Sequence, residues 1–295
     1  MDVEMKIQEP INKVTRKQKL KNYSKHPGSF LLALLTKLAI LLTVLALGFI
    51  LIYILVKGIP NLSTDLFALK YTTENVSMLP AIINTLMITL LSLCIAGPIG
   101  IFSAIYLVEY AKKGNKLVEV VRFTAETLTG IPSIVYGLFG MLFFVTTLKC
   151  GYSLLAGALT LSIMVLPVIM RTTEEALLAV PNSFREGSFG LGAGKLRTIF
   201  KIVLPSAVPG ILAGVILAIG RMVGETAALI YTAGTVAEIP SSIMSSGRTL
   251  AIHMYSLSKE GLYTNQAYAT AVVLLIVVVL INMLSNFVAK KFTKK

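Results

Sequence analysis

Charged residues are scarce in this chain. Only 14% of its 295 residues are charged, 55% are hydrophobic, and the mean hydropathy is +0.80. A soluble globular domain carries about 25% charged residues and about 45–50% apolar ones. The composition therefore excludes an ordinary soluble domain and indicates several membrane spans rather than one large core.

Cysteine and histidine are almost absent, with two residues of each. Cys94 lies near the middle of one apolar run and Cys150 at the edge of another, so as spans they would differ in depth by about 15 Å. A disulfide requires Cα atoms within about 7 Å of each other, so we expect two free thiols. His26 and His253 are isolated, and no Cys or His spacing is typical of a metal or redox site. We therefore expect no cofactor and no metal.

Acidic residues are also few, 14 against 27 Lys and Arg, which gives a net charge of +13. This excess does not indicate a nucleic-acid partner, because the basic residues cluster in the chain ends and in short connections between apolar runs. Twenty of them fall on one side of the predicted topology: in the N-terminal tail, the second and fourth connections and the C-terminal tail. The other side has five: Lys57, Lys70, Lys149, Arg248 and Lys259. Cytoplasmic loops carry the excess of Lys and Arg, so the pattern predicts that both termini are cytoplasmic.

Six apolar stretches are long enough to span a bilayer. We predict spans at Phe30–Val56, Pro80–Val108, Phe123–Leu148, Leu154–Met170, Val208–Ala233 and Gln266–Val288. The first run is longer than the 7–15 apolar residues of a signal peptide, so we interpret it as an uncleaved span. The basic tail before it, residues 1–29, is a topology signal, and contact with anionic membrane lipid is the alternative.

The longest cytoplasmic connection, from Arg171 to Ala207, predicts a helix, a glycine turn and a second helix. Ser183 and Glu186 have the spacing of a capping box, with a helix that starts at Phe184. Glycine disfavours helix interiors, so we expect a turn at Gly190, Gly192 and Gly194. The second helical piece is predicted over Lys195 to Val203, with Pro205 ending it.

This connection resembles the signature of ABC importer permeases, which reads Glu-Ala-Ala, three residues, Gly, nine residues, Ile-x-Leu-Pro. The chain has Glu186-Gly187-Ser188, then Gly192, then Ile202-Val203-Leu204-Pro205, with both spacings intact and two small residues in place of the alanines. In that family the segment is the coupling helix, which docks in a groove of the ATPase subunit. The resemblance implies that Glu186, Gly187, Ser188, Gly192, Ile202, Leu204 and Pro205 belong to a docking element. The structural alternative is an amphipathic loop that lies on lipid headgroups.

Two other segments resemble phosphate importer permeases, and the PstA-type subunit in particular. They are Gly130-Ile131-Pro132-Ser133-Ile134-Val135-Tyr136-Gly137-Leu138-Phe139-Gly140 and Gly220-Arg221-Met222-Val223-Gly224-Glu225-Thr226-Ala227. The resemblance implies an all-α type I permease with six transmembrane helices and a cytoplasmic coupling helix in a bacterial or archaeal cell (inner) membrane. It implies a PstC-type second permease, a PstB-type ATPase dimer and an external PstS-type phosphate-binding protein as partners. The implied division is a basic tail (1–29), a first span with an external loop (30–79), a permease domain (80–289) and a basic C-terminus (290–295).

Arg221 and Glu225 are the strongest physical anomaly, because they are the only cation and anion deep in the predicted fifth span. A charge at mid-bilayer costs roughly 2.5–3.5 kcal/mol on insertion scales, and such residues face a bundle interior or an aqueous path. Four residues apart on one helix, they could form a structural pair. In the functional interpretation Arg221 contacts an anion in the translocation path through a bidentate guanidinium, and Glu225 orients it.

Three function classes remain open at this point. The first is a non-catalytic permease subunit for phosphate, with a PstC-type subunit or another oxyanion (sulfate, molybdate) as the alternatives within it. The second is a self-contained secondary transporter that uses Glu225 for ion coupling. An intramembrane enzyme has no support, since no nucleophile–base pair is evident. ATP hydrolysis is expected in a separate subunit, because Gly194-Lys195 lacks the flanking Gly and Ser or Thr of a phosphate-binding loop.

Overall fold

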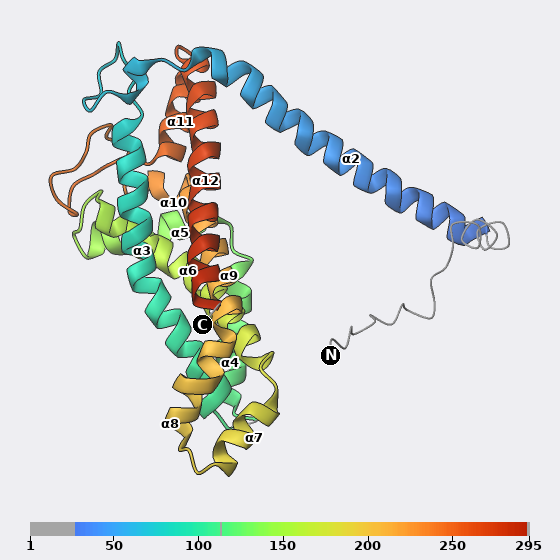
Figure 1. Ribbon diagram of the computed structural model, residues 1–295. Coiled ribbons are helices and arrows are strands. Elements are labelled where there is room, and N and C mark those ends of the chain that lie inside the picture. Colours follow the sequence, from blue (N-terminus) through green and yellow to red (C-terminus); the bar gives the residue numbers. More distant parts are fainter. Residues whose placement is uncertain (1–26, 113, 294–295) are drawn as a thin grey trace, which may run out of the picture. The chain divides into compact units, whose positions relative to one another are not determined.

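The computed structural model describes residues 27–112 and 114–293, and every regular element in these ranges is a helix (Figure 1). Most of the predicted N-terminal tail, residues 1–26, lies outside the described residues, whereas most of the predicted C-terminus, residues 290–293, belongs to α12. The α-helices are α2 (Pro27–Gly58), α3 (Leu79–Ile105), α4 (Lys116–Thr129), α5 (Ser133–Gly140), α6 (Leu154–Leu178), α7 (Asn182–Gly190), α8 (Lys195–Thr198), α9 (Leu204–Val223), α10 (Ala227–Ile230), α11 (Leu250–Glu260) and α12 (Thr264–Thr293). Short 3-10 turns are η1 (Ile59–Asn61) and η2 (Thr64–Phe67), and π-helical segments are η3 (Tyr106–Tyr110), η4 (Met141–Thr147) and η5 (Ile199–Val203).

The chain divides into two units, Met1–Ile54 and Leu55–Lys295. The described part of the first unit is most of α2, whose large apolar side chains are exposed all round, as a lipid-facing span requires. The last turn of α2 belongs to the second unit. There a Cβ on Gly58 would lie 2.4 Å from the backbone oxygen of Tyr268, so only glycine allows this approach to α12.

The predicted all-α multi-span class is confirmed. Five helices are long and apolar enough to cross a membrane, and a bent pair, α4 with α5 and η4, gives up to six. This pair corresponds to the predicted third span, and it bends by 104° at its break. Cys94 and Cys150 are free, as expected.

Predicted boundaries of the fourth and fifth spans are wrong, including the end of the fifth at Ala233, because α9 ends at Val223. The fourth span, α6, does not end at Met170 but continues to Leu178, because charged residues on its last turns find partners on α4. The fifth span does not begin at Val208. A continuous helical stretch runs from Lys195 to Val223, through Pro205. Proline is tolerated there because it lies in the first turn of α9, directly after the wide π-helical segment η5.

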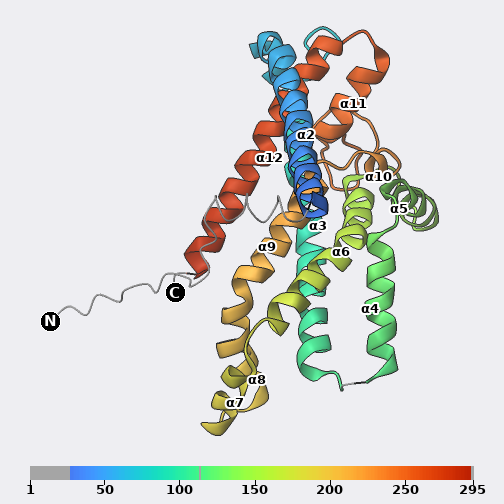
Figure 2. The ribbon, with the colours of Figure 1, turned by 90° about the vertical axis from the view of Figure 1, so that its right-hand side faces the viewer.

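The core of the second unit lies where α3, α6 and α9 pack side by side (Figures 1 and 2). Ile88, Leu161, Met164 and Met222 are fully buried there. In Figure 1, α7 and α8 lie at one end of this unit, and α11 and the segment before α3 lie at the other. Successive spans cross the membrane in opposite directions, so their connections are expected to alternate between the two ends.

Candidate functional site

Two helix breaks meet in the second unit. The first lies between α4 and α5 at Gly130–Pro132, and the second lies between α9 and α10 at Gly224–Thr226. A Cβ on Gly137 of α5 would lie 2.8 Å from the Cα of Ala228 in α10, so the two helices that follow the breaks touch through their backbones. Discontinuous helices of this kind build midplane substrate sites in transporters.

The local sequence explains the first break. Pro132 has no amide hydrogen, and the residue before a proline avoids the helical region. The carbonyl of Leu128, freed at the end of α4, accepts hydrogen bonds from the amide of Ile131 (3.2 Å) and the hydroxyl of Tyr136 (2.7 Å). In an apolar environment each freed backbone group must find such a partner. Tyr136, which the sequence presented only as part of a family motif, therefore holds the bend.

Arg221 lies in the last turn of α9, next to the second break. It is half-buried, and its guanidinium is close enough to Tyr136 to interact with it electrostatically. Within the described part of the chain, no carboxylate lies within ion-pairing distance of Arg221. A cation at a helix C-terminus gains some stabilisation from the helix dipole, but the charge keeps its capacity to bind an anion.

Glu225 does not lie on the same helix as Arg221. The expectation of one continuous helix is wrong, because α9 ends at Val223 and Gly224 opens the break. Glu225 is 8% exposed, and its Oε1 accepts a hydrogen bond of 3.0 Å from the amide of Ala228 in α10. The carboxylate therefore caps the short helix after the break, as a buried charge without a salt bridge requires. This geometry removes the basis for a resting Arg221–Glu225 pair.

The predicted docking element is formed by α7, α8 and the turn between them. Gly192 has φ +81°, a left-handed conformation that L side chains rarely adopt, so the predicted glycine turn is confirmed. The capping-box prediction is wrong: α7 begins at Asn182 after Pro181, whose fixed φ prepares the first turn, and no side-chain cap bond is present. Ser188 and Thr198, both buried, share a hydrogen bond of 2.8 Å that holds α7 against α8.

Arg185 fixes this element to the transmembrane core. Its guanidinium pairs with Glu109 at 2.7 Å and donates to the carbonyls of Leu177 (2.9 Å) and Val180 (2.8 Å). Lys195 lies 4.8 Å from the ring centre of Tyr110. Two residues at the end of the second span, in η3, therefore contact both helical pieces and connect them to α3.

A pocket of about 270 Å³ opens between α7 and the start of the long fifth helix. It is lined by Ser188, Leu191, Gly192, Ala193, Arg197, Lys201 and Ile202. Of the predicted docking residues, Ser188, Gly192 and Ile202 meet here, whereas Glu186, Gly187 and Pro205 lie exposed elsewhere and Leu204 is half-buried. Leu191 is 91% exposed, and the flanking helical segments carry further exposed apolar side chains: Phe184, Phe189, Leu196 and Phe200. An apolar surface beside exposed cations, here Arg197 and Lys201, is typical of a protein-docking site.

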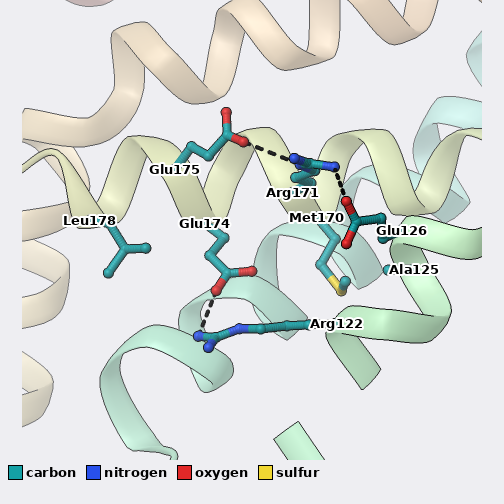
Figure 3. Close-up of a pocket in the computed structure, with 8 residues that line it drawn as sticks. All are labelled: Arg122, Ala125, Glu126, Met170, Arg171, Glu174, Glu175 and Leu178. Atoms are coloured by element: carbon teal, nitrogen blue, oxygen red, sulfur yellow. Dashed lines mark hydrogen bonds and ion pairs between the residues drawn. The ribbon is translucent and has the colours of Figure 1, made fainter. Parts of the chain in front are cut away.

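A second pocket, of about 300 Å³, lies between α4 and α6 (Figure 3). Glu174 reaches across it to Arg122 at 2.6 Å, and Arg171 pairs with Glu175 at 3.2 Å and with Glu126 at 3.6 Å. The pairs Arg122–Glu174 and Arg171–Glu126 join α4 to the last turns of α6. The sequence analysis missed them because it ended the fourth span at Met170. The i, i+4 spacings of Arg122 with Glu126 and of Arg171 with Glu175 were the available signal.

The described geometry defines a class: a multi-span membrane subunit with two broken helices at its centre and a helix–turn–helix element at one end. Solved structures share this fold. The chain resembles a bacterial alginate ABC transporter (TM-score 0.67, 16% identity, 92% of this chain, 98% of that chain) and the MetNI methionine ABC transporter (TM-score 0.56, 20% identity, 82% and 98%).

Curated relatives are considerably closer. The chain is 38% identical over 270 residues to the phosphate transport system permease protein PstA of Pasteurella multocida, covering 87% of this chain and 92% of the relative. It is 32% identical over 261 residues to the probable ABC transporter permease protein YqgI of Bacillus subtilis, covering 82% and 88%. Residues 96–295 match the family of binding-protein-dependent transport system inner membrane components. The chain belongs to this family and is a membrane permease subunit of an ABC importer.

Proposed function

We propose that this chain is the PstA-type permease subunit of a phosphate importer and forms half of the translocation path for inorganic phosphate. The observation that carries the proposal is Arg221, a cation with no carboxylate partner among the described residues, at the point where two broken helices meet. The phosphate permeases among the relatives give the substrate class. Arg221 would hold phosphate briefly through two charge-assisted hydrogen bonds, weakly enough for release.

Glu225 has a positioning role in this proposal. Its carboxylate holds the amide of Ala228, so it fixes the break that presents Arg221. A secondary transporter would need Glu225 as its ion-coupling carboxylate. Because this carboxylate caps α10, it is not free to exchange an ion, and the importer subunit is the better function.

The energy for transport would come from a partner. The exposed apolar and basic surface around Leu191, Arg197 and Lys201 supports docking of a PstB-type ATPase dimer, with this subunit itself non-catalytic. A PstC-type permease would complete the path, and a PstS-type binding protein would deliver phosphate outside. Anionic membrane lipid would contact the basic tail.

The proposed orientation places both termini and the docking element in the cytoplasm of a bacterial or archaeal cell, with the multi-pass chain in the (inner) membrane. Reporter fusions test it. A fusion after Lys295 should report cytoplasm, and a fusion near Ser245 should report the exterior, because 20 of the 27 basic residues lie on the side of the termini. An external signal from the C-terminal fusion would contradict the six-span topology.

Uptake of labelled phosphate tests the function itself. In a strain that lacks its own phosphate importer, the chain together with the three partner subunits should restore uptake that stops when ATP is depleted. A large excess of sulfate or molybdate should not compete. Uptake by the chain without the ATPase subunit would identify a secondary transporter, and uptake of sulfate instead of phosphate would refute the substrate class.

A further inference from the structure

Arg248, in the connection between α10 and α11, is a buried cation without a counter-ion. It is 6% exposed, and its Nε and Nη2 have no hydrogen-bond partner. No carboxylate in the described residues pairs with it. A buried charge normally finds a partner, because leaving one unpaired costs several kcal/mol. An arrangement that keeps this guanidinium buried and unpaired points to a ligand that comes and goes.

Two aromatic side chains surround the guanidinium. The ring centre of Tyr71 lies 4.6 Å from its central carbon, a cation–π contact that offsets only part of the cost. His253 of α11 is fully buried and meets the edge of the Tyr71 ring, with 6.2 Å between the ring centres. By hydrogen-bond geometry neither ring nitrogen of His253 has a partner, although the backbone of Val76 lies close enough to act on the imidazole. Hydrogen-bonding groups on two side chains therefore remain unused in one buried cluster.

His253 does not add a second positive charge to this cluster. Burial, and then the charge of Arg248, lower the pKa of His253 to about 3, while the backbone of Val76 opposes the shift. At neutral pH the imidazole is therefore uncharged, with one N–H donor and one nitrogen acceptor. The cluster combines one fixed positive charge with a neutral imidazole whose unprotonated nitrogen can accept a hydrogen bond.

The start of α3 holds the backbone of Arg248 in place. The side-chain amide nitrogen of Asn84, Nδ2, donates to the backbone carbonyls of Arg248 (3.2 Å) and Glu238 (3.0 Å). The Thr85 hydroxyl accepts from the backbone amide of Leu250 (2.8 Å). A Cβ on the neighbouring Gly247 would lie 2.8 Å from the Asn84 nitrogen, so the contact is close. This support lies towards the end of the second unit opposite α7 and α8 (Figure 1). The arrangement preorganises the cation, as anion sites require.

We propose that Arg248 and His253 form a second oxyanion site, which receives inorganic phosphate on the external side before the anion reaches Arg221. The inference rests on the proposed phosphate transport. Nε and Nη2 are the two donors on one edge of the guanidinium, the fork that binds two phosphate oxygens. Phosphate near neutral pH keeps a P–OH group, which the acceptor nitrogen of His253 can bind; sulfate has no such group. Tyr71 covers the site in this conformation and moves aside when the anion enters.

The variant Arg248→Met tests this site in the assembled complex. Methionine keeps an unbranched stem and removes the charge, so without phosphate the complex should unfold at the same or a higher temperature. In the wild type, inorganic phosphate should raise the unfolding temperature relative to chloride or sulfate at equal ionic strength. Arg248→Met should lose most of this shift and transport about tenfold more slowly.

Two controls make the result specific. Lys259→Met removes an exposed cation from α11, the helix that carries His253, and should keep the full phosphate shift. Arg221→Gln leaves Arg248 in place, so it should keep the part of the shift that Arg248→Met loses. Any phosphate bound to the ATPase contributes equally in both variants and therefore cancels in the comparison. An unchanged shift and normal uptake in Arg248→Met would refute the external site. So would a fall in unfolding temperature without phosphate, which indicates a structural role. If the wild type transports no phosphate at all, the proposed function fails instead.

Discussion

Replacing Arg221 by glutamine should reduce phosphate uptake about 100-fold, while the complex still assembles and hydrolyses ATP. The variant loses the charge and the fork that would bind two phosphate oxygens. A pair of charge-assisted hydrogen bonds contributes about 3 kcal/mol to binding, which corresponds to this loss of uptake. No carboxylate partner of Arg221 is lost, because none lies within ion-pairing distance in the described residues. Folding should therefore be spared, and initial rates of labelled-phosphate uptake measure the effect.

Related variants separate charge from geometry. Arg221→Lys keeps the charge without the planar fork, so uptake should fall only partly. Lys149→Gln, at an exposed cation outside the break, should transport like the wild type. Glu225→Gln weakens the cap on the Ala228 amide without removing the oxygen acceptor, so its effect should be smaller than that of Glu225→Leu. Wild-type uptake by Arg221→Gln would exclude a contact with the substrate.

Replacing Gly192 by valine should abolish uptake and uncouple the ATPase, although the chain still inserts in the membrane. At φ +81° a β-branched residue is strained by about 1–3 kcal/mol, so the turn between α7 and α8 would rearrange. The 270 Å³ pocket and the position of Leu191 depend on this turn. The pair of Arg185 with Glu109 lies outside the turn, so the element should stay attached to the core. Co-purification of the ATPase subunit and uptake rates are the measurements.

Gly187→Ala is the matched control for this turn. A Cβ on Gly187 meets nothing within 4 Å, and alanine restores the residue of the family signature. Uptake and ATPase binding should be unchanged or improved. A cysteine at Leu191, which is 91% exposed, should crosslink to the ATPase subunit. Labelling of that cysteine from outside the cell would overturn both the docking role and the topology.

The sequence predicted the helical class and the docking turn because these depend on local patterns. Apolar stretches of about 20 residues identify spans, and Gly192 sits at the point where the chain needs a left-handed residue. The breaks were harder to predict. The predicted third and fifth spans each ran through one of these breaks, at Gly130–Pro132 and at Gly224–Thr226, so straight helices were expected where the chain bends or ends.

Side-chain partners explain the other errors. Glu225 was paired with Arg221 from its spacing alone, but the end of α9 directs its carboxylate to the Ala228 amide. Pro205 was expected to end a helix, and the π-helical segment before it allows the helix to continue. The contacts of Arg122 with Glu174 and of Arg248 with Tyr71 join residues far apart in sequence, which no local pattern encodes.

The most direct test of the account is ATP-dependent uptake of labelled phosphate by the reconstituted complex that carries both Arg221→Leu and Glu225→Leu. If Arg221 contacts the anion in the path, this double variant should hydrolyse ATP but transport almost no phosphate. The resting structure shows no Arg221–Glu225 pair in the described residues, so only a pair formed in another conformation of the transport cycle would let function return when both charges are removed together. Normal phosphate uptake by the double variant would therefore contradict the account.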